Sequence, residues 1–361
     1  MIGTFGGADV KVVVAESKSK PLPALTVHPA SWGNFFNTLR QNYLDHHYAF
    51  RDVLISWNNY FDIFVMLSSS PNSRVLIGKD RWLFLKYDSV GRNIQLDAQH
   101  PEPLSQTKLA ELAKIFEERR VWLAERGIRY VVLLPPSKNT VYPEKLPHSL
   151  QPTDPGRHLR ELIAYLRAHT QVDIVDVTPS LLDHKKDGFV FFARDNHWNA
   201  LGAFVGYTEL ARHLQTYFPA IKLLERQQFR EETYRNYPGD LASMTGLTTL
   251  FKEDRTMFVN TKWYKARGAS YDGPMQDWYL TMPQRSVLEN PALPRALVLH
   301  DSFWLEMMPF IGESFREALY IWALPPTQQA FRRFDKQLIE RFKPDVVIDE
   351  FAERYIMITV R

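Results

Sequence analysis

The segment Arg295–Phe303 carries the sharpest chemical feature of the sequence. An apolar run, Ala296–Leu299, leads through His300 directly into Asp301 and Ser302, and a helix-like segment follows. A serine at a strand-to-helix turn lies at the edge of a sheet, near the first N–H groups of the helix, and these groups can stabilise an oxyanion. The same pattern also fits a simple helix cap formed by Asp301 and Ser302. Spacing alone leaves both interpretations open.

A serine nucleophile needs a general base, and the base needs a group that orients it. The sequence Asp195-Asn196-His197-Trp198 supplies both within three residues, at a second expected strand-to-helix junction. If this segment is extended, Asp195 and His197 project to the same side. The alternative is again a cap, with the His197 ring satisfied by backbone groups. Two distant strand ends thus each supply the missing part of one Ser302–His197–Asp195 triad, and we predict that they meet.

Three other groups of polar residues receive structural interpretations. Asp45-His46-His47 does not suit a metal ion, because adjacent helical residues point about 100° apart, so we expect a helix surface there. Glu350 and Arg354 are spaced for an i,i+4 ion pair if the segment is helical. Lys138 follows an expected strand and could reach the site, but we expect a surface lysine. No phosphate-binding glycine motif occurs, and we expect neither a cofactor nor a metal.

Composition narrows the classes of function. The 361 residues are 45% hydrophobic and 24% charged, which is ordinary for a soluble globular protein. The 44 basic and 41 acidic residues give a net charge of +3, too balanced to indicate a nucleic-acid partner. The absence of cysteine excludes thiolate catalysis, disulfides and cysteine-ligated metal sites.

The periodicity of apolar residues predicts short buried strands that alternate with amphipathic helices. Strands are expected within 74–85 and at 129–134, 172–177, 188–192, 296–300, 319–322 and 345–348, and helices at 32–66, 105–127, 157–169, 198–217 and 327–342. This alternation is typical of an α/β fold with a mainly parallel sheet flanked by helices. In such sheets functional side chains lie where strands end.

Domain organisation follows from the same pattern. We expect a flexible lead-in at 1–30 and one catalytic domain at 31–361. The irregular stretch 219–294 is interpreted as an insertion before the nucleophile strand that has small elements of its own and covers the site. Residues 1–26 lack the apolar core of a secretion signal, and apolar runs such as 63–67 are too short to span a bilayer. Either the protein is cytoplasmic, or an export segment precedes this sequence in nature.

Taken together, the motifs resemble those of the SGNH hydrolase-like family that includes the alginate O-acetyltransferases AlgJ and AlgX. The resemblance runs from about residue 32 to 357. Its seven segments, each weak alone but specific in their order, are Tyr43–Arg51, Gly78–Phe84, Pro136–Pro143, Asp195–Gly202, Gly239–Ala242, Asp301–Phe303 and Lys343–Ile348.

The resemblance implies that Ser302 is the nucleophile, His197 the general base and Asp195 its orienting group. It implies O-acetylation of an exported polysaccharide, such as alginate, through an acetyl-serine. It also implies a periplasmic or other extracytoplasmic protein, tethered to the inner membrane by an N-terminal segment absent from this sequence. A membrane-bound O-acyltransferase would be the partner that brings the acetyl donor.

His300 departs from the family pattern, because many SGNH enzymes have glycine before the Asp-Ser pair. It is expected either to crowd the oxyanion hole or to add a polar contact there. Two alternative functions stay open: an acetyl esterase that uses the same triad with water as acceptor, and a non-catalytic polysaccharide-binding scaffold.

Overall fold

The computed structural model describes residues 74–87, 93–99, 102–259, 284–323 and 334–357. The expected lead-in at 1–30, the helix at 32–66 and the Asp45-His46-His47 segment all lie outside the described residues. Among the described residues, no helix is both long enough and apolar enough to cross a membrane.

A six-stranded sheet forms the centre of the fold, in the order β4-β3-β10-β8-β9-β7. Its strands are β3 (Arg129–Leu134), β4 (Asp173–Asp176), β7 (Gln284–Val287), β8 (Arg295–His300), β9 (Glu317–Trp322) and β10 (Val346–Glu350). The first five strands of that order are parallel, and β7 joins β9 in the antiparallel sense. The prediction of a mainly parallel sheet is therefore confirmed.

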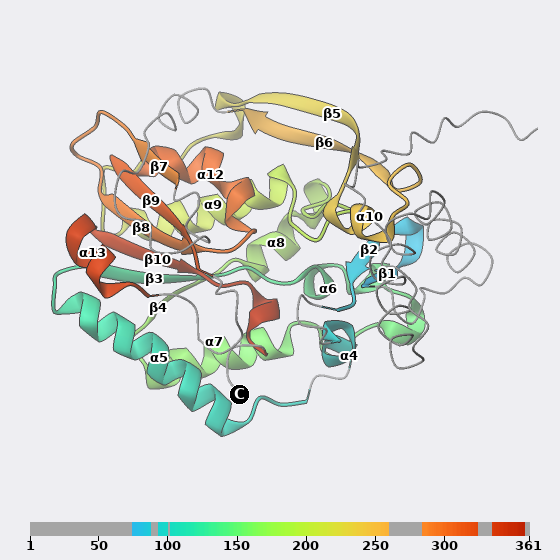
Figure 1. The fold of residues 1–361 in the computed structure, drawn as a ribbon, viewed down its shortest axis with the longest axis horizontal. Coiled ribbons are helices and arrows are strands. Elements are labelled where there is room, and N and C mark those ends of the chain that lie inside the picture. Colours follow the sequence, from blue (N-terminus) through green and yellow to red (C-terminus); the bar gives the residue numbers. More distant parts are fainter. Residues whose placement is uncertain (1–73, 88–92, 100–101, 260–283, 324–333, 358–361) are drawn as a thin grey trace, which may run out of the picture.

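Helices cover both faces of this sheet (Figure 1). One layer contains α8 (Thr178–His184), α9 (Ala200–Gln215) and α12 (Trp304–Ile311), and the other contains α5 (Gln106–Ala124), α7 (Arg157–His169) and α13 (Lys336–Phe342). Alternate residues of β3 serve the two layers: Val131 and Leu133 face the first core, and Val132 and Leu134 face the second. A strand buried on both faces has to be apolar throughout, which explains the continuous hydrophobic runs in the sequence.

Local signals set the helix boundaries. Ser105 caps α5, because its side chain accepts the N–H of Lys108, as expected. Asn199 caps α9 by accepting the N–H of Gly202. The helix expected from Trp198 therefore begins two residues later, since Asn199 is held in an extended conformation.

Two small sheets and several short elements complete the fold. β1 (Val75–Ile77) pairs with β2 (Leu83–Leu85), and β5 (Arg230–Pro238) pairs with β6 (Lys252–Val259). The short helices are α4 (Ile94–Gln99), α6 (Lys138–Val141) and α10 (Asp240–Thr245), and the 3-10 turns are Lys79–Arg81, Pro143–Lys145, His148–Leu150, Lys185–Asp187, Arg226–Gln228, Gly312–Ser314 and Glu353–Tyr355. The stretch 219–294 thus contributes β5, α10 and β6, and its last strand, β7, belongs to the central sheet.

The strand expected at 188–192 is wrong. Residues 190–199 instead form a narrow loop, in which Phe191 bridges Trp198 and the N–H of Phe192 donates to the carbonyl of His197. Val190 and Phe191 are apolar because they are buried in the core beneath α9 rather than paired in the sheet. We call this segment, 190–199, the Asp-His loop.

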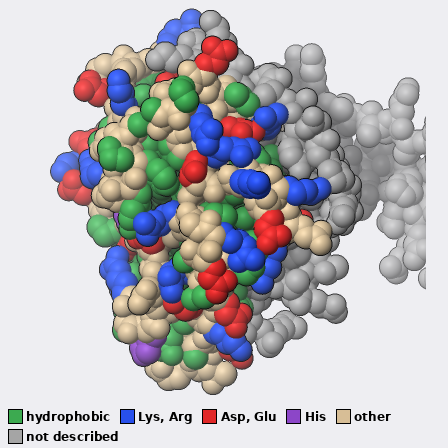
Figure 2. All heavy atoms as spheres, turned by 90° about the vertical axis from the view of Figure 1, so that its left-hand side faces the viewer, with side chains coloured by type: hydrophobic (Ala, Val, Ile, Leu, Met, Phe, Trp, Pro, Cys, Tyr) green, Lys and Arg blue, Asp and Glu red, His purple; other side chains and the backbone are tan. Residues whose placement is uncertain are grey.

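Charge is evenly mixed on the face seen from the left-hand side of Figure 1. Figure 2 shows basic and acidic side chains interspersed over the described part of this face, without a field of one sign. This distribution agrees with the nearly balanced composition, 44 basic against 41 acidic residues.

Candidate active site

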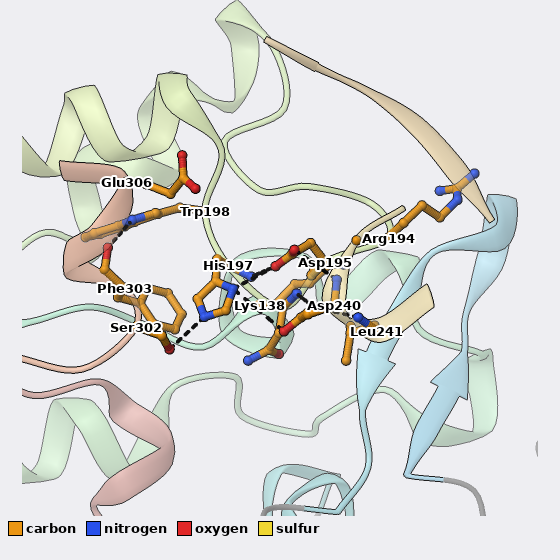
Figure 3. Close-up of polar contacts among 12 residues, drawn as sticks. Lys138, Arg194, Asp195, His197, Trp198, Asp240, Leu241, Ser302, Phe303 and Glu306 are labelled. Carbon is orange, nitrogen blue, oxygen red and sulfur yellow. Dashed lines mark hydrogen bonds and ion pairs between the residues drawn. The ribbon is translucent and has the colours of Figure 1, made fainter. Parts of the chain in front are cut away.

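Ser302 lies between the carboxyl end of β8 and the start of α12, and its hydroxyl meets the base expected from the sequence. Its Oγ lies 2.7 Å from Nε2 of His197 (Figure 3). Because β8 and β10 are parallel neighbours, Ser302 emerges where the polar residues after β10 also emerge.

The Asp301 side chain fixes the backbone of this turn. Its carboxylate accepts the N–H of Phe303 at 2.9 Å and the N–H of Ala352 at 3.3 Å. Its own N–H donates to Glu350 at 2.7 Å, and the side chain is fully buried. Helix α12 has Phe303 at its N-cap and no side-chain capping hydrogen bond, so the interpretation of Asp301 and Ser302 as a simple helix cap is wrong. The Ser302 hydroxyl faces His197.

Asp195 orients the imidazole from the other side. Oδ1 of Asp195 lies 2.7 Å from Nδ1 of His197 and also accepts the His197 N–H at 3.0 Å. Oδ2 accepts the N–H of Asp240 at 3.0 Å. The Asp195 carboxylate is thus held by three contacts, and the imidazole lies between it and Ser302. The three residues predicted from the sequence are brought together.

The two carboxyl groups beside His197 differ in pKa. Burial acts to raise the pKa of Asp195, but the hydrogen bond and charge of His197 outweigh it and bring that pKa well below its ordinary value. Burial, together with the negative charge of Asp195, raises the pKa of Asp240 to about 6. Asp195 therefore stays ionised at neutral pH, as an orienting carboxylate must.

The Asp-His loop is anchored from the 219–294 stretch. The Glu253 carboxylate on β6 accepts the N–H groups of Ala193 and Arg194 at 2.8 and 2.6 Å. The backbone of Gly239 approaches so closely that a Cβ there would lie 2.3 Å from the carbonyl oxygen of Arg194. Asp240 adds a further bond by accepting the N–H of Asn196 at 2.7 Å.

Lys138 is buried, so the expectation of a surface lysine is wrong. Its side chain is 2% exposed, and Nζ donates to the carbonyl oxygens of Leu83 at 2.7 Å, Ala193 at 3.0 Å and Asp195 at 3.0 Å. Burial lowers the pKa of Lys138 to about 7, against the attraction of Glu253. Lys138 joins β2 to the backbone of the Asp-His loop. It is buried because the carbonyl oxygens of these segments accept its hydrogen bonds.

Trp198 and Phe303 connect the two halves of the site. The indole N–H of Trp198 donates to the carbonyl of Phe303 at 2.9 Å, and both rings are buried. The Phe303 ring meets the His197 imidazole edge-on, with centroids 5.2 Å apart. Gly206 on α9 makes room for the indole, because a Cβ there would lie 3.0 Å from it.

The expected Glu350–Arg354 ion pair on a helix is also wrong. Glu350 is the last residue of β10, and Arg354 lies in the 3-10 turn Glu353–Tyr355 that follows. Glu350 instead accepts the N–H of Asp301, and Nη2 of Arg354 donates to Oγ of Ser302 at 3.0 Å. Arg354 could not be predicted as a site residue from its spacing, because its contact with Ser302 depends on the ends of β8 and β10 lying side by side.

His300 points toward backbone and β9. Its Nδ1 lies 2.9 Å from the carbonyl oxygen of Asp301, and its ring meets Trp322 edge-on at 5.8 Å. The ring is buried. His300 thus contacts the Asp301 backbone, and its expected effect on the oxyanion hole stays a prediction.

Asp195, His197 and Asp240 also form a group whose ligand atoms lie within 4.8 Å of one another, as a metal site would require. In the structure, however, these carboxylate oxygens accept N–H groups: Oδ1 and Oδ2 of Asp195 as described, and Oδ1 of Asp240 from Asn196 and Leu241. This pattern favours a hydrogen-bonded orienting role for the group.

A cleft opens at Phe303 and Arg354, which adjoin Ser302 along the chain and through a hydrogen bond. Its walls include Ser137, Asn139, Thr140, Asn196, Phe303 and Arg354. The cleft offers space for a substrate beside Phe303 and Arg354, and its walls combine polar and aromatic side chains, as ligand sites commonly do. A hydroxyl, an imidazole and a carboxylate connected in this order are the groups that acyl transfer by a serine triad uses.

The sequence matches a known family over most of the described chain. The profile of the family described as "SGNH hydrolase-like domain, acetyltransferase AlgX" matches residues 75–287. Among curated proteins, the "Probable alginate O-acetylase AlgJ" of Pseudomonas aeruginosa is 30% identical over 183 residues, which are 50% of this chain and 43% of that protein. The chain therefore matches less than half the length of this relative.

Solved structures share the fold. PatB1 of Bacillus cereus superposes with a TM-score of 0.56 at 16% identity, covering 79% of this chain and 97% of that one. A DHHW family protein from Eubacterium siraeum gives a TM-score of 0.55 at 15% identity, covering 78% and 91%. The "O-Acetyltransferase Domain of Pseudomonas putida AlgJ" gives 0.50 at 20% identity, covering 79% and 92%. At these identities the likeness establishes the fold alone.

Proposed function

This chain belongs to the SGNH hydrolase-like domain family of the acetyltransferase AlgX, and on that premise we propose that it is a polysaccharide O-acetyltransferase. One observation carries the proposal: Oγ of Ser302, the imidazole of His197 and Oδ1 of Asp195 form a continuous chain with two contacts of 2.7 Å. The alginate O-acetylase named above supports a polysaccharide as the acceptor.

In the first half of the proposed reaction, His197 removes a proton from Ser302. Nε2 accepts the hydroxyl proton while Oγ attacks the carbonyl carbon of an acetyl ester. The tetrahedral intermediate then collapses, the bond from carbon to the leaving oxygen breaks, and His197 returns the proton to that oxygen. Ser302 is left as an acetyl ester, and Asp195 stabilises the imidazolium that forms in between.

In the second half, a sugar hydroxyl enters the cleft and gives its proton to His197. The sugar oxygen attacks the acetyl carbon, and the bond from that carbon to Oγ of Ser302 breaks. Oγ takes back the proton from His197. General base action of this kind contributes roughly 10²–10⁴-fold to the rate.

The oxyanion of each tetrahedral intermediate is assigned to the Ser302 N–H and neighbouring donors at the start of α12. The N–H of Phe303 does not join them in the resting site, because it donates to Asp301. Loss of one such donor costs roughly 3–4 kcal/mol of transition-state stabilisation.

We propose further that the protein works outside the cytoplasm, tethered at the inner membrane. A membrane-bound O-acyltransferase partner would deliver the acetyl donor across the bilayer. A reconstituted pair of the two proteins, assayed for acetylation of polysaccharide with each partner omitted in turn, tests this assignment.

Trapping of Ser302 tests the proposed chemistry. A serine-directed sulfonyl fluoride is expected to modify Ser302 alone, and His197→Ala should abolish the modification. Ser149→Ala, at an exposed serine, is the matched control and should label normally. Absence of any labelled serine in the unaltered protein would contradict the acyl-transfer proposal and favour a polysaccharide-binding protein.

Product analysis then separates transfer from hydrolysis. The protein is incubated with an activated acetyl ester and an oligosaccharide, and the products are weighed by mass spectrometry. Acetylated oligosaccharide supports the transferase. Free acetate alone would identify an acetyl esterase that uses water as the acceptor.

A further inference from the structure

Arg354 reaches the active site from the turn after β10, whereas Ser302 follows β8 and His197 and Asp195 lie on the Asp-His loop. It lies in the turn that follows β10, and β10 runs parallel to β8, with Asp349 in register with Leu299. Parallel neighbours end at the same edge of a sheet, so the turn after β10 and the residue after β8 come together. The topology therefore brings a guanidinium beside Ser302.

The guanidinium contacts the hydroxyl that reacts. Nη2 of Arg354 donates to Oγ of Ser302 at 3.0 Å and to Oη of Tyr355 at 3.0 Å. The same group lies 5.2 Å from the ring centroid of Phe303 and 4.8 Å from that of Tyr355. Contacts of this kind between a cation and an aromatic ring are worth about 0.5–2 kcal/mol and hold the guanidinium in place.

The hydrogen-bond partners of Arg354 are two hydroxyl groups, those of Ser302 and Tyr355. In the described part of the chain, no carboxylate lies within ion-pair distance of its guanidinium. The nearby carboxylates of Asp301 and Glu350 accept backbone N–H groups at the strand ends. Among the residues that the structure describes, the Arg354 guanidinium therefore pairs directly with no acid, and one of its hydrogen bonds goes to Ser302.

The turn that carries Arg354 is fixed on both sides. Glu353 accepts the N–H of Ser137 at 2.6 Å and the hydroxyl of Thr140 at 2.8 Å, and its own N–H donates to the carbonyl of Pro135 at 2.9 Å. Ala352 donates its N–H to Asp301. These bonds tie the turn to the segment after β3 and to the serine turn itself, so Arg354 is presented from a rigid backbone.

We propose that Arg354 is a catalytic residue that stabilises the negative charge on Oγ of Ser302 in both halves of the reaction. In the resting site the hydroxyl donates its proton to His197 and accepts a hydrogen bond from Arg354, which a serine can do at once. As the proton moves to His197, charge grows on Oγ, and a hydrogen bond from a cation strengthens. When the acetyl-serine collapses, the same oxygen leaves with the bonding electron pair, and the same donor faces it. The guanidinium keeps its protons throughout.

An arginine suits this role better than a lysine. Its guanidinium is charged at every pH the protein meets, and its planar fork can donate to Ser302 and Tyr355 in a fixed geometry. Lys138, another buried basic residue near the site, donates to three carbonyl groups. The two basic residues therefore differ in role: Lys138 stabilises the Asp-His loop, and Arg354 contacts Oγ of Ser302.

The inference rests on the proposed function, and the experiment separates the two. The second-order rate of Ser302 modification by a sulfonyl fluoride is measured for the full chain and for Arg354→Met, Arg354→Lys and Arg354→Ala. Arg354→Met should lose at least about 10²-fold in rate, as removal of an oxyanion donor does. Arg212→Met is the matched control, because Arg212 is an exposed arginine on α9 that pairs with Glu209 and lies outside the cleft lining, and it should label at the normal rate.

Rescue distinguishes a chemical role from a structural one. Guanidinium ion, added far below unfolding concentrations, should restore the labelling of Arg354→Ala, whereas tetramethylammonium at equal ionic strength should not. If the unaltered protein labels and Arg354→Met labels equally fast, the inference is overturned while the proposed function stands. If the unaltered protein does not label at all, the proposed function itself fails. If Arg354→Met is slow but guanidinium ion gives no rescue to a folded Arg354→Ala, the effect is structural and the inference is overturned.

Discussion

Asp240 donates its backbone N–H to Oδ2 of Asp195 at 3.0 Å, so the carboxylate that orients His197 is itself held by a residue 45 positions further along the chain. The side chain of Asp240 accepts the N–H of Asn196 in return. This reciprocal pair fixes the Asp-His loop against the start of α10. The orientation of the imidazole therefore depends on the 219–294 stretch as well as on the loop.

Asp195→Asn is expected to lower the rate of acetyl transfer by roughly 10³–10⁴-fold, the range seen when the orienting acid of a serine triad becomes an amide. An amide cannot stabilise the imidazolium, and it can favour the wrong tautomer of His197. Initial rates with a chromogenic acetyl ester measure the loss. Asp183→Asn, which changes an exposed acid paired with Lys186, is the control and should retain full activity. An Asp195→Asn rate near that of the control would refute the orienting role.

Asp240→Asn is expected to change how stability depends on pH. The folded-state pKa of Asp240 is raised from 3.8 to about 6, chiefly by burial, so the folded state holds this proton more tightly than the unfolded chain does. The unaltered protein should therefore lose stability relative to Asp240→Asn as pH rises from about 4 to 6, and the difference should level off above 6. After allowance for solvent screening, the free energy of unfolding of the unaltered protein should fall by about 1 kcal/mol relative to that of Asp240→Asn.

Urea unfolding of both proteins at several pH values between 4 and 8 measures this difference. The asparagine keeps a carbonyl oxygen that can accept the N–H groups of Asn196 and Leu241, so the comparison isolates the charge. A difference in the free energy of unfolding that stays constant across the whole range would contradict the raised pKa of Asp240.

Lys138→Met is expected to lower the free energy of unfolding by roughly 2–4 kcal/mol, because three buried carbonyl groups lose their donor. The Asp-His loop loses a support at the same time, so the acetyl-transfer rate should fall even in the folded protein. Lys114→Met, on the exposed side of α5, is the matched control and should change neither quantity. Chemical unfolding followed by kinetics below the unfolding transition separates the two effects. A stable, fully active Lys138→Met would show that the carbonyl cluster does not need the ammonium.

Gly239→Ala is expected to disturb the site by contact alone. The backbone of Gly239 has φ −70°, which alanine adopts easily, but a Cβ would lie 2.3 Å from the Arg194 carbonyl oxygen and 2.8 Å from the Asp195 nitrogen. Overpacking of this kind costs roughly 1–3 kcal/mol and should displace the Asp-His loop. Reduced activity together with reduced thermal stability is the expected result.

Gly127→Ala provides the opposite case. Gly127 has φ +70° with no atom within 4 Å of an added Cβ, so alanine there is strained but meets nothing. It should lower stability by about 1 kcal/mol and leave activity unchanged. If Gly239→Ala behaves in the same way as Gly127→Ala, the close approach to Arg194 has no bearing on the reaction.

Most of the sheet and its helices could be predicted from the sequence. β3 and α7 begin and end at the predicted residues, because a strand buried on both faces and an amphipathic helix each impose a strong pattern. The Ser302, His197 and Asp195 side chains also meet as predicted, but Asp195 and His197 lie on the Asp-His loop and not at the expected strand end. Their roles in catalysis stay predictions that the labelling experiments address.

The parts that could not be predicted depend on contacts between distant segments. Val190–Phe192 has the composition of a strand, but its burial beneath α9 folds it into a loop instead. A lysine is typical of a surface position. Lys138 is buried because β2 and the Asp-His loop lie side by side and present carbonyl oxygens that accept its hydrogen bonds. Arg354 was placed on a helix by its spacing from Glu350, because local spacing carries no information about which strand lies beside β10.

The Glu253 carboxylate accepts two N–H groups of the Asp-His loop from β6, which pairs with β5 in a two-stranded sheet that is separate from the central sheet among the described residues. A peripheral hairpin of this kind is a natural candidate for removal in a shortened version of the protein. In this molecule the hairpin cannot be shortened across Glu253 without releasing the backbone on which Asp195 and His197 are mounted. A minimal version must therefore keep the stretch from Gly239 to Glu253, however dispensable its outer surface looks.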